Sequence, residues 1–291
     1  MKIVTHNERF HADDVFATAV MQIMYGSDAE VVRSRDTDVI NSADIVYDVG
    51  GIYDEEKNRF DHHQQEFSET RENGIPYAAF GLVWKKWGEK ICGSKIVADM
   101  VDKKLVQVID AGDNGFKTHE KLNKDYSSYS VDWMIKSFGP SWKEDKGFDY
   151  DTAFFKAVDF AKPILEREIK LAQDSAEAIP IVEKAYSDAK DKRIIIFDRF
   201  VPRGDILNKY PEPAFVISPE ADTDRWRMVA VQEEGFVNRV DPPMEWRGLY
   251  DEELQKASGV DDAVFCHRSG FLTIAGSFDG IMKMVNIALK N

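Results

Sequence analysis

The sequence predicts an α/β protein with a parallel sheet in its first half and a smaller αβ region in its second half. Short runs rich in β-branched residues at 2–5, 30–35 and 45–49 are typical of buried parallel strands. They alternate with apolar stretches of helical length, which is the pattern of strands joined by crossover helices. A long amphipathic run over 151–176 then separates the two halves.

Size and charge narrow the classes of partner. The chain has 291 residues, of which 43% are hydrophobic, enough for one large domain or two ordinary ones with a sizeable core. Its net charge of −14 argues against non-specific wrapping of nucleic acid, so no long duplex is expected as a partner. A short phosphorylated substrate stays compatible, because bound divalent cations supply local positive charge.

The cysteine content and the N-terminal sequence predict that the protein is located in the cytoplasm or another reducing intracellular compartment. Cys92 and Cys266 lie far apart and form neither a metal-type pair nor a disulfide framework. The chain starts as a strand rather than as a signal peptide. No apolar stretch approaches the ~18 residues of a membrane span, so no membrane partner is expected. The sequence leaves the oligomeric state undefined.

The first strand leads into a turn rich in acids and imidazoles. The strand ends at His6, and a buried helix is expected over 15–24. His11, Asp13 and Asp14 lie between them. An N-cap role explains one of the two acids, but it does not explain the whole group. Ligands of open α/β sheets bind at the carboxyl ends of the strands, so a site is expected at this turn.

The third strand and the stretch after it carry the most specific ligand pattern. Asp48 closes the strand, and a Gly-Gly pair after it allows a sharp turn. Asp61, His62 and His63 follow a short distance later. Asp and His are ligand types that hold Mn, Fe and Zn. Because side chains alternate along an extended stretch, one histidine is expected to meet a metal and its neighbour a second metal or the substrate.

Two helices are expected next, at 77–91 and 94–109, with their apolar faces in the core. Asp110 and Asp113 follow the second helix. Either they form a further acidic ligand group, or they belong to a helix C-terminus that turns at Asn114-Gly115. In the loop-rich stretch that follows, Trp133, Phe138 and Trp142 are expected to be packing residues rather than platforms for base stacking.

Four acidic or imidazole groups thus fall at the ends of expected strands or helices within the first 115 residues. This number of candidate ligand side chains is about what two divalent cations with four to six ligands each require. Two cations ~3.5–4 Å apart can clamp the attacking and leaving oxygens of a displacement at phosphorus and can lower the pKa of a bound water. The pattern is therefore typical of a two-metal site for phosphoryl chemistry.

The second half is expected to contain four strands and a terminal helix, at 193–197, 214–218, 225–232, 263–266 and 279–289. Arg239, Arg247 and His267 lie near strand ends or in loops and are candidates for substrate contact. The planar fork of an arginine suits a phosphate. Packing within this half of the chain is the alternative explanation of each of these side chains.

The sequence resembles the DHH phosphoesterase superfamily, which is named for the triplet seen here as Asp61-His62-His63, and within it the Myg family. The matching stretches cover nearly the whole chain in the same order. They are Thr5-His6-Asn7, Phe10-His11-Ala12-Asp13, residues 32–36, residues 44–54, residues 60–64, Asp110 with Asp113-Asn114-Gly115, residues 246–249 and Ser269-Gly270-Phe271.

The resemblance implies two domains with a metal cleft between them. Residues 1–150 would form a metal-binding catalytic domain, 151–178 a connecting helix, and 179–291 a smaller αβ domain that binds substrate. It also implies phosphodiester hydrolysis, as a 3′–5′ exonuclease on RNA or short oligonucleotides. The alternatives are a small-molecule pyrophosphatase or nucleotide phosphatase, and a non-catalytic metal-binding scaffold.

The resemblance also implies roles for individual residues. The implied metal ligands are His6, His11, Asp13, Asp48, His62 and Asp110. Asp48 would bridge two cations, and His63 would face the substrate. Asp113 is the alternative to Asp110 as the last metal ligand. Asp14 and Asp61 are the remaining alternates.

Three departures from the usual patterns matter. Asn7-Glu8 stands where the Myg pattern has Asn-Gly after His6. His11 stands where most members of the superfamily have a carboxylate, which removes one negative charge and favours Mn over Mg, with Fe or Zn as alternatives. After Gly270-Phe271-Leu272, the Gly-Gly pair of the Myg pattern is replaced by residues 273–276. Because glycines let backbone N–H groups approach a phosphate, this replacement predicts an altered substrate-binding loop.

Overall fold

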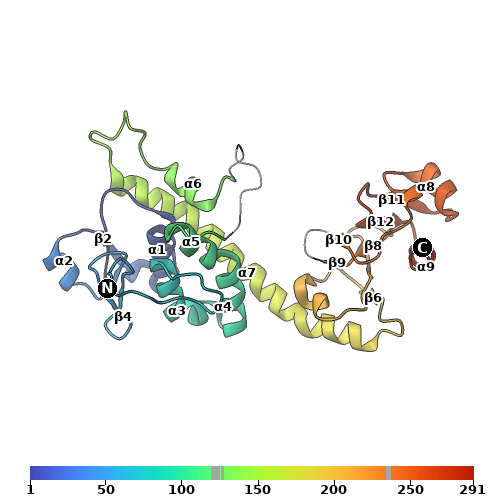
Figure 1. Ribbon diagram of the computed structural model, residues 1–291, viewed down its shortest axis with the longest axis horizontal. Coiled ribbons are helices and arrows are strands. Elements are labelled where there is room, and N and C mark those ends of the chain that lie inside the picture. Colours follow the sequence, from blue (N-terminus) through green and yellow to red (C-terminus); the bar gives the residue numbers. More distant parts are fainter. Residues whose placement is uncertain (119–124, 126–127, 234–236) are drawn as a thin grey trace. The chain divides into compact units, whose positions relative to one another are not determined.

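A computed structural model describes residues 1–118, 125, 128–233 and 237–291 (Figure 1). The chain forms two compact units, unit 1 over Met1–Gln173 and unit 2 over Asp174–Asn291. The division falls inside the long helix α7, Tyr150–Asp188. This helix extends beyond the expected end near residue 176. Its apolar periodicity continues through Ala178 and Val182, which are buried in the core of unit 2, and Pro180 does not end it.

Unit 1 is built on a five-stranded sheet of order β2-β1-β3-β5-β4, in which β2, β1, β3 and β5 run parallel and β4 is antiparallel to β5. The mixed α/β class predicted from the sequence is confirmed. The strands are β1 Lys2–Thr5, β2 Glu30–Arg33, β3 Ile45–Tyr47, β4 Tyr53–Asp54 and β5 Arg59–Phe60. The three parallel strands β1, β3 and β5 end side by side, so the segments that follow them meet at one edge of the sheet.

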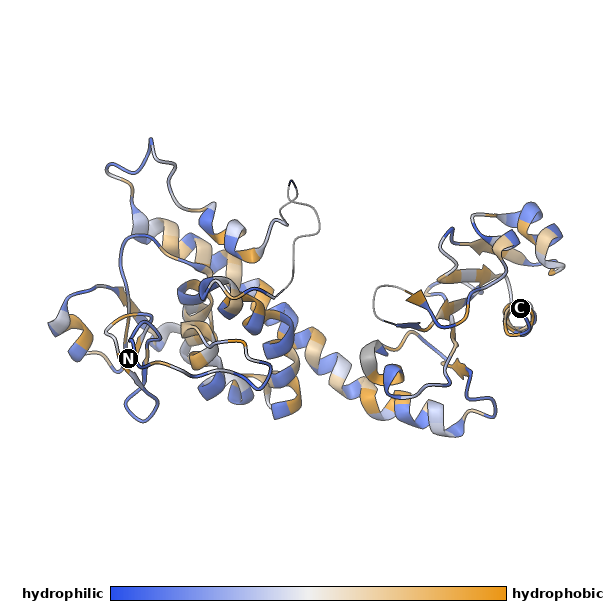
Figure 2. Ribbon diagram, viewed as in Figure 1, coloured by the Kyte–Doolittle hydropathy of each residue, from blue (hydrophilic) through white to orange (hydrophobic). Residues whose placement is uncertain are grey.

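Helices pack around this sheet (Figure 1). They are α1 Ala12–Tyr25, α2 Thr37–Asn41, α3 Ala79–Cys92, α4 Lys95–Val101, α5 Gln107–Asp113 and α6 Val131–Lys136, with a short 3₁₀ turn at Gly26–Asp28. Helix α1 packs on α3, and the rings of Phe16 and Phe80 lie 5.4 Å apart. Apolar residues of these helices form the core of unit 1, while polar residues cover their outer faces (Figure 2).

The helix expected over 94–109 continues to Asp113. A π-helical segment, Asp102–Val106, joins α4 to α5. The extra residue per turn in this segment changes the direction in which the following side chains point, and such insertions are frequent at functional sites. Asp110 is therefore buried inside a helix rather than placed in a loop after it.

Unit 2 contains a second five-stranded sheet, of order β11-β12-β8-β7-β6, in which β6 and β7 are parallel and the other pairs antiparallel. Its strands are β6 Ile194–Ile196, β7 Phe215–Pro219, β8 Trp226–Ala230, β11 Ala263–Cys266 and β12 Leu272–Ala275, with a separate β9 Gln232–Glu233 and β10 Val237–Asn238 pair. Helices α8 Asp251–Ser258 and α9 Phe278–Ala288 and 3₁₀ turns at Gly204–Lys209 and Met244–Trp246 complete it.

The altered loop expected after Gly270 is mostly a strand. β12 lies between β11 and β8, and Thr273, Ile274 and Ala275 are buried. The residues that replace the glycines therefore pair with neighbouring strands, for which a β-branched Thr-Ile pair is well suited.

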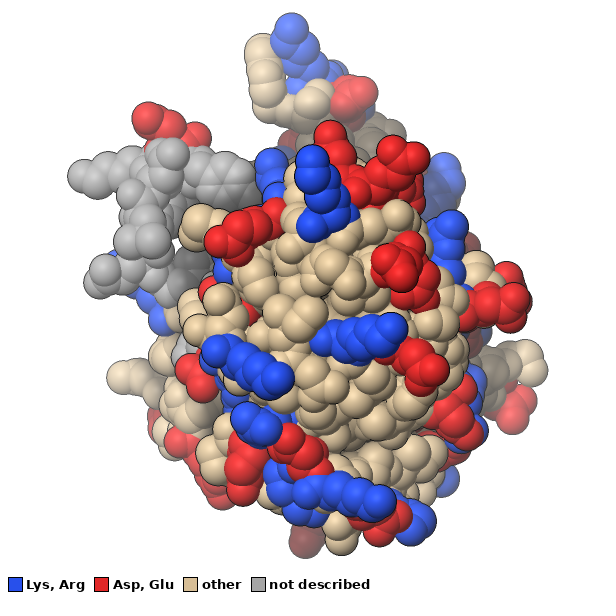
Figure 3. Space-filling model, turned by 90° about the vertical axis from the view of Figure 1, so that its right-hand side faces the viewer, with Lys and Arg blue, Asp and Glu red and all other residues tan. Residues whose placement is uncertain are grey.

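The surface of unit 2 carries both signs of charge. On the face that Figure 3 shows, lysines and arginines are interspersed with aspartates and glutamates. An even mixture of this kind does not form the continuous basic track that long nucleic acids require. Among the helices that the structure describes, none combines the length and the apolar character needed to cross a membrane.

Gly81 of α3 packs directly against the Asp110 side chain of α5. The Asp110 carboxylate accepts a hydrogen bond from Gly81 N, 3.0 Å away, and forms an ion pair with Arg71 at 2.8 Å. A methyl group on the Gly81 Cα would come within 1.8 Å of Asp110 Oδ2 and 2.8 Å of an Arg71 nitrogen. Only glycine leaves room for this buried carboxylate.

We expect Gly81→Ala to destabilise the protein by about 1–3 kcal/mol or more, because the added methyl group overpacks a buried and charged site. Chemical denaturation measures the free energy of unfolding. Glu89→Ala, at an exposed position of the same helix, is the matched control and should change stability by only about 0.5 kcal/mol. Equal stability of the two variants would contradict the close approach of α3 and α5.

Candidate metal centre

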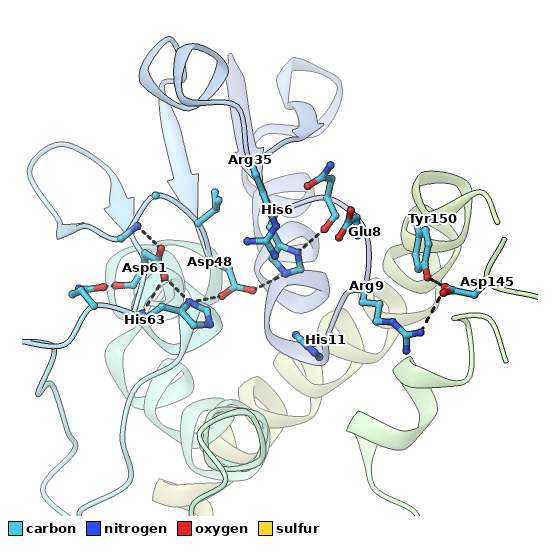
Figure 4. Close-up of a pocket in the computed structure, with 15 residues that line it drawn as sticks. His6, Glu8, Arg9, His11, Arg35, Asp48, Asp61, His63, Asp145 and Tyr150 are labelled. Atoms are coloured by element: carbon cyan, nitrogen blue, oxygen red, sulfur yellow. Dashed lines mark hydrogen bonds and ion pairs between the residues drawn. The ribbon is translucent and has the colours of Figure 1, made fainter. Parts of the chain in front are cut away.

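The carboxyl edge of the unit 1 sheet gathers the acidic and imidazole side chains. His6 follows β1, Asp48 follows β3, and the triplet Asp61-His62-His63 follows β5. The first turn of α1 contributes Asp13 and Asp14, with His11 as the residue before the helix. Asp113 ends α5 on the same side. Figure 4 shows His6, His11, Asp48, Asp61 and His63 around one cavity.

Asp48 lies at the middle of this group. Its carboxylate is 3.1 Å from His6 Nε2, 3.5 Å from His63 Nδ1 and 3.9 Å from His62 Nδ1. The residue is buried, and its backbone has a φ of +56°, a conformation that costs energy for a residue other than glycine. Gly50 and Gly51 follow with φ of +97° and +67°. The strained turn directs the Asp48 carboxylate towards histidines from two other strands.

Several buried polar atoms of this group have no hydrogen-bond partner among the described residues. They are both carboxylate oxygens of Asp13, Asp14 Oδ2, Asp48 Oδ1 and His62 Nδ1. A buried, unpartnered carboxylate is costly, and a bound ion is one of the few ordinary explanations. Oxygen and imidazole donors together suit Mn, Fe or Zn. The donor set therefore fits divalent cations.

The ligand atoms are close enough to share cations. In four sets the candidate atoms all lie within 4.8 Å of one another. The sets are Asp48, Asp61, His62 and His63; His6, His11 and Asp48; His11, Asp13 and Asp113; and Asp13, Asp14 and Asp48. Asp48 belongs to three of the four sets, which is the arrangement that a carboxylate shared between two cations would require.

Hydrogen bonds to backbone groups orient the candidate ligands. His6 Nδ1–H donates to the Asn7 carbonyl, 3.0 Å away, which leaves Nε2 directed at the carboxylates. Asp61 Oδ1 accepts from His62 N, His63 N and His63 Nδ1, and its Oδ2 accepts from Gly51 N at 2.6 Å. Asp61 thus fixes the triplet against the Gly-Gly turn.

The two histidines of the triplet lie side by side, so the expectation that they point to opposite sides is wrong. Their rings stack with centroids 4.3 Å apart and an angle of 26° between planes. The alternation of an extended strand ends at Phe60, and the hydrogen bonds of Asp61 fold the following residues into a turn. The His62 side chain is 6% exposed and that of His63 is 63% exposed, so only His63 is accessible to a substrate.

Burial and mutual repulsion raise the pKa of two acids in the first turn of α1. Burial and the nearby charges of Asp48 and Asp113 hold the pKa of Asp13 well above its usual value. Burial raises the pKa of Asp14 to about 7, although His6 opposes the shift. Burial alone would lower the pKa of His6, but the hydrogen bond with Asp48 and the charge of Asp14 raise it overall. Without cations, this cluster retains protons near neutral pH.

The structure separates the two acids that competed for the last ligand position. The Asp110 carboxylate is fully buried against Arg71 and the backbone of Gly81, and it belongs to none of the ligand sets in the described residues. Asp113 Oδ2 lies 3.0 Å from His62 Nε2, and Asp113 forms a set with His11 and Asp13. The geometry favours Asp113. Sequence alone did not reveal that the helix continues to Asp113, with Asp110 one turn earlier against Arg71 and Gly81 and Asp113 at its end beside His62.

The candidate substrate residues of the second half lie in unit 2. Arg239 donates hydrogen bonds to the carbonyls of Tyr210 and Pro213 at 2.6 and 3.2 Å. The Arg247 guanidinium lies 3.0 Å from Asp241, and His267 Nδ1 lies 2.8 Å from Ser269 Oγ. Arg239 therefore connects two loops, whereas His267 is half-buried, with its ring 4.6 Å from that of Phe271.

Arg33 has a supporting function that the sequence did not identify. Its side chain is 1% exposed, donates to the Glu8 carbonyl at 2.7 Å and pairs with Asp151 at the start of α7 at 2.7 Å. Glu8 has a φ of +66°, within the turn that joins His6 to His11. Arg33 thus holds the turn that carries two candidate ligands. The matching stretch 32–36 was the signal for a special function here.

Comparison with known proteins gives consistent matches along the chain. A family model named for MYG1 exonuclease, and described as an uncharacterised protein family (UPF0160), matches residues 2–289. A MYG1 protein of Schizosaccharomyces pombe is 31% identical over 99% of this chain and 97% of its own length. The MYG1 exonuclease of Homo sapiens is 28% identical over 99% of this chain and 85% of its own length.

Among solved structures, a pGpG-specific phosphodiesterase from Vibrio cholerae aligns with all of this chain and 99% of its own. Its sequence identity is 12% and its TM-score is 0.32. A TM-score this low does not establish a shared fold.

The raised pKa of Asp14 predicts a pH-dependent loss of stability in the metal-free protein. A carboxyl whose folded-state pKa is raised stabilises the fold fully below its unfolded value near 4, and this contribution is lost as pH rises through about 7. Asp14→Asn removes the titration. Without metal, the variant should therefore gain in melting temperature relative to the unsubstituted protein between pH 5 and pH 8. Saturating Mn should remove the difference. A pH-independent difference would contradict the raised pKa that burial gives Asp14.

Asp113→Asn and Asp110→Asn should have opposite effects on metal content and stability. Asp113→Asn removes a candidate ligand, so bound Mn should fall while the melting temperature of the metal-free protein stays close to normal. Asp110→Asn removes one of the two carboxylates that pair with Arg71, which keeps Asp102 at 2.8 Å, so unfolding should become easier by roughly 1–3 kcal/mol with less effect on Mn content. Elemental analysis and thermal melts check both. The reverse pattern would restore Asp110 as the ligand.

Proposed function

Because the chain belongs to the MYG1 family, we propose that it is a divalent-metal-dependent phosphodiesterase that acts as a 3′–5′ exonuclease on RNA or short oligonucleotides. The observation that carries the proposal is the set of buried, unpartnered carboxylate and imidazole atoms around Asp48. Relatives over the full length bear the name exonuclease, which supports a hydrolase of this class. We also assign the chain to the DHH phosphoesterase superfamily, on the triplet 61–63 and its place after β5.

We propose that two cations bind, with Asp48 between them. His6, His11 and Asp13 would hold one side and His62 the other, with Asp113 beside His62 and also within reach of His11 and Asp13. Asp14 and Asp61 would orient their neighbours. When bound, the cations supply positive charge for a phosphoryl group and lower the pKa of an attacking water. Mn suits this set better than Mg, because imidazoles replace part of the oxygen ligands that Mg prefers.

His63 is the side chain best placed to act on the substrate. It is exposed, and the hydrogen bond from its Nδ1 to Asp61 raises its pKa above the usual value. A protonated His63 can donate a hydrogen bond from Nε2 to a phosphate oxygen and can give a proton to the leaving oxygen. Asp61 keeps the ring in this orientation, in the manner of a carboxylate that orients a catalytic histidine.

In unit 2, Arg247 and His267 remain proposed substrate contacts, and Arg239 a weaker one. The Arg239 guanidinium already serves two backbone carbonyls. A charge-assisted contact from Arg247 to a phosphate would contribute roughly 1.5–3 kcal/mol.

A small-molecule pyrophosphatase or nucleotide phosphatase is the second candidate, and the net charge of −14 favours a small substrate over a long one. A substrate panel separates the two. With Mn, we expect hydrolysis of a 5-residue RNA from its 3′ end, and slower or no release of phosphate from pyrophosphate or a nucleoside bisphosphate. Faster turnover of pyrophosphate would replace the proposed function. No activity on any substrate, and no bound metal, would support a scaffold.

Asp48→Asn is the variant that ties the activity to the cluster. The amide keeps the shape of the carboxylate but loses the charge shared between two cations, so RNA hydrolysis should fall more than about 100-fold with little change in circular dichroism. Asp38→Asn, exposed on α2, is the control and should keep full activity. Near-normal turnover of Asp48→Asn at saturating Mn would remove Asp48 from the centre.

A further inference from the structure

Two cavities of unit 1 meet at the candidate metal centre. One has a volume of about 760 Å³ and is lined by His6, Arg35 and the Gly50-Gly51 turn (Figure 4). The other, of about 610 Å³, is lined by Asp113, Trp133 and Lys136. His11 and His63 line both cavities. A substrate at the metal centre can therefore extend into two separate spaces.

The first cavity contains a positively charged side chain that has no ion-pair or hydrogen-bond partner among the described residues. Arg35 is exposed, and within the described part of the chain its guanidinium forms no ion pair and no hydrogen bond. The other arginine of this cavity, Arg9, lies 3.6 Å from Asp145. The planar guanidinium of an arginine suits the paired oxygens of a phosphate. Arg35 is therefore available for an anion bound near, but separate from, the metal centre.

The second cavity holds an exposed aromatic ring. Trp133, on α6, is 56% exposed, so the expectation that it is a packing residue is wrong for this side chain. Lys136 Nζ lies 5.6 Å from the centre of the ring. An exposed indole beside a positive charge is the arrangement on which single-stranded bases stack. Trp142 is 83% exposed but does not line this cavity.

We propose that the two cavities bind the two sides of one phosphodiester: Trp133 stacks on a base in the second cavity, and Arg35 binds a neighbouring phosphate in the first. The inference rests on the proposed function and narrows its substrate to a 5′-phosphorylated dinucleotide or the 3′ end of a longer oligonucleotide. Pyrophosphate has no base for Trp133 and no 5′-phosphate for Arg35. The cavities thus favour a diester with a nucleoside on each side.

The test uses the full chain with Mn and three kinds of dinucleotide. These are a 5′-phosphorylated dinucleotide, the same molecule without its 5′-phosphate, and two analogues in which one base or the other is missing. Trp133→Ala should lower kcat/KM for the full dinucleotide roughly tenfold. It should also abolish the preference for the full dinucleotide over the analogue that lacks the base stacked on Trp133. Trp133→Phe should retain most of that preference. Arg35→Gln should reduce the preference for the 5′-phosphate by about tenfold.

Two control variants match these changes. Trp142→Ala removes another exposed indole, outside the second cavity, and Arg167→Gln removes an exposed arginine of α7 outside both cavities. Both control variants should hydrolyse and bind the dinucleotides as the unsubstituted protein does. Calorimetric titration with a non-hydrolysable phosphorothioate dinucleotide gives the same comparison for binding, independently of turnover.

The outcomes separate the inference from the proposed function. If dinucleotides are hydrolysed but Trp133→Ala and Arg35→Gln match their controls in turnover and in binding, the cavity assignment is overturned and the function stands. If no diester is hydrolysed but binding still depends on both side chains, the function fails and the assignment stands. If the unsubstituted protein neither hydrolyses nor binds dinucleotides, both are overturned.

Discussion

The structure of unit 1 depends on the burial of several carboxylates at one edge of a parallel sheet. Asp13, Asp14 and Asp48 are each at most 3% exposed, and four of their oxygens have no hydrogen-bond donor among the described residues. Such an arrangement is unfavourable unless protons or cations neutralise it. The raised pKa of Asp14 is a consequence of this burial. Bound cations would offset the cost of the buried charges, while the positive φ of Asp48 is a separate backbone strain that positions its carboxylate.

Supporting residues keep this unfavourable arrangement in place. Arg33 holds the turn between His6 and His11 through the Glu8 carbonyl. Asp61 holds the triplet, and the ion pair of Arg71 with Asp110 holds α5, whose last residue is Asp113. Each of these contacts is formed within the protein and needs no cation. Contacts within the protein therefore orient the candidate ligands, in the way that second-shell groups orient ligands in metal sites generally.

Much of the placement of the candidate ligands was predictable because these residues follow strands. Short β-branched runs place His6, Asp48 and the triplet at one sheet edge, and elementary rules of parallel sheets bring them together. Asp110 and Asp113 were not separable, because a π-helical segment changes the helix phase, and no residue pattern marks such a segment. The side-by-side histidines depend on a turn held by the Asp61 side chain. The exposure of Trp133 depends on where α6 packs, which local sequence does not encode.

The central claim, that two cations share Asp48, is tested most directly by electron paramagnetic resonance during a Mn titration of the metal-free protein. The account predicts that two Mn ions bind per chain and that their signals broaden into the spectrum of a spin-coupled pair as the second ion binds. A spectrum of isolated Mn at every loading, or saturation at one ion per chain, would contradict it.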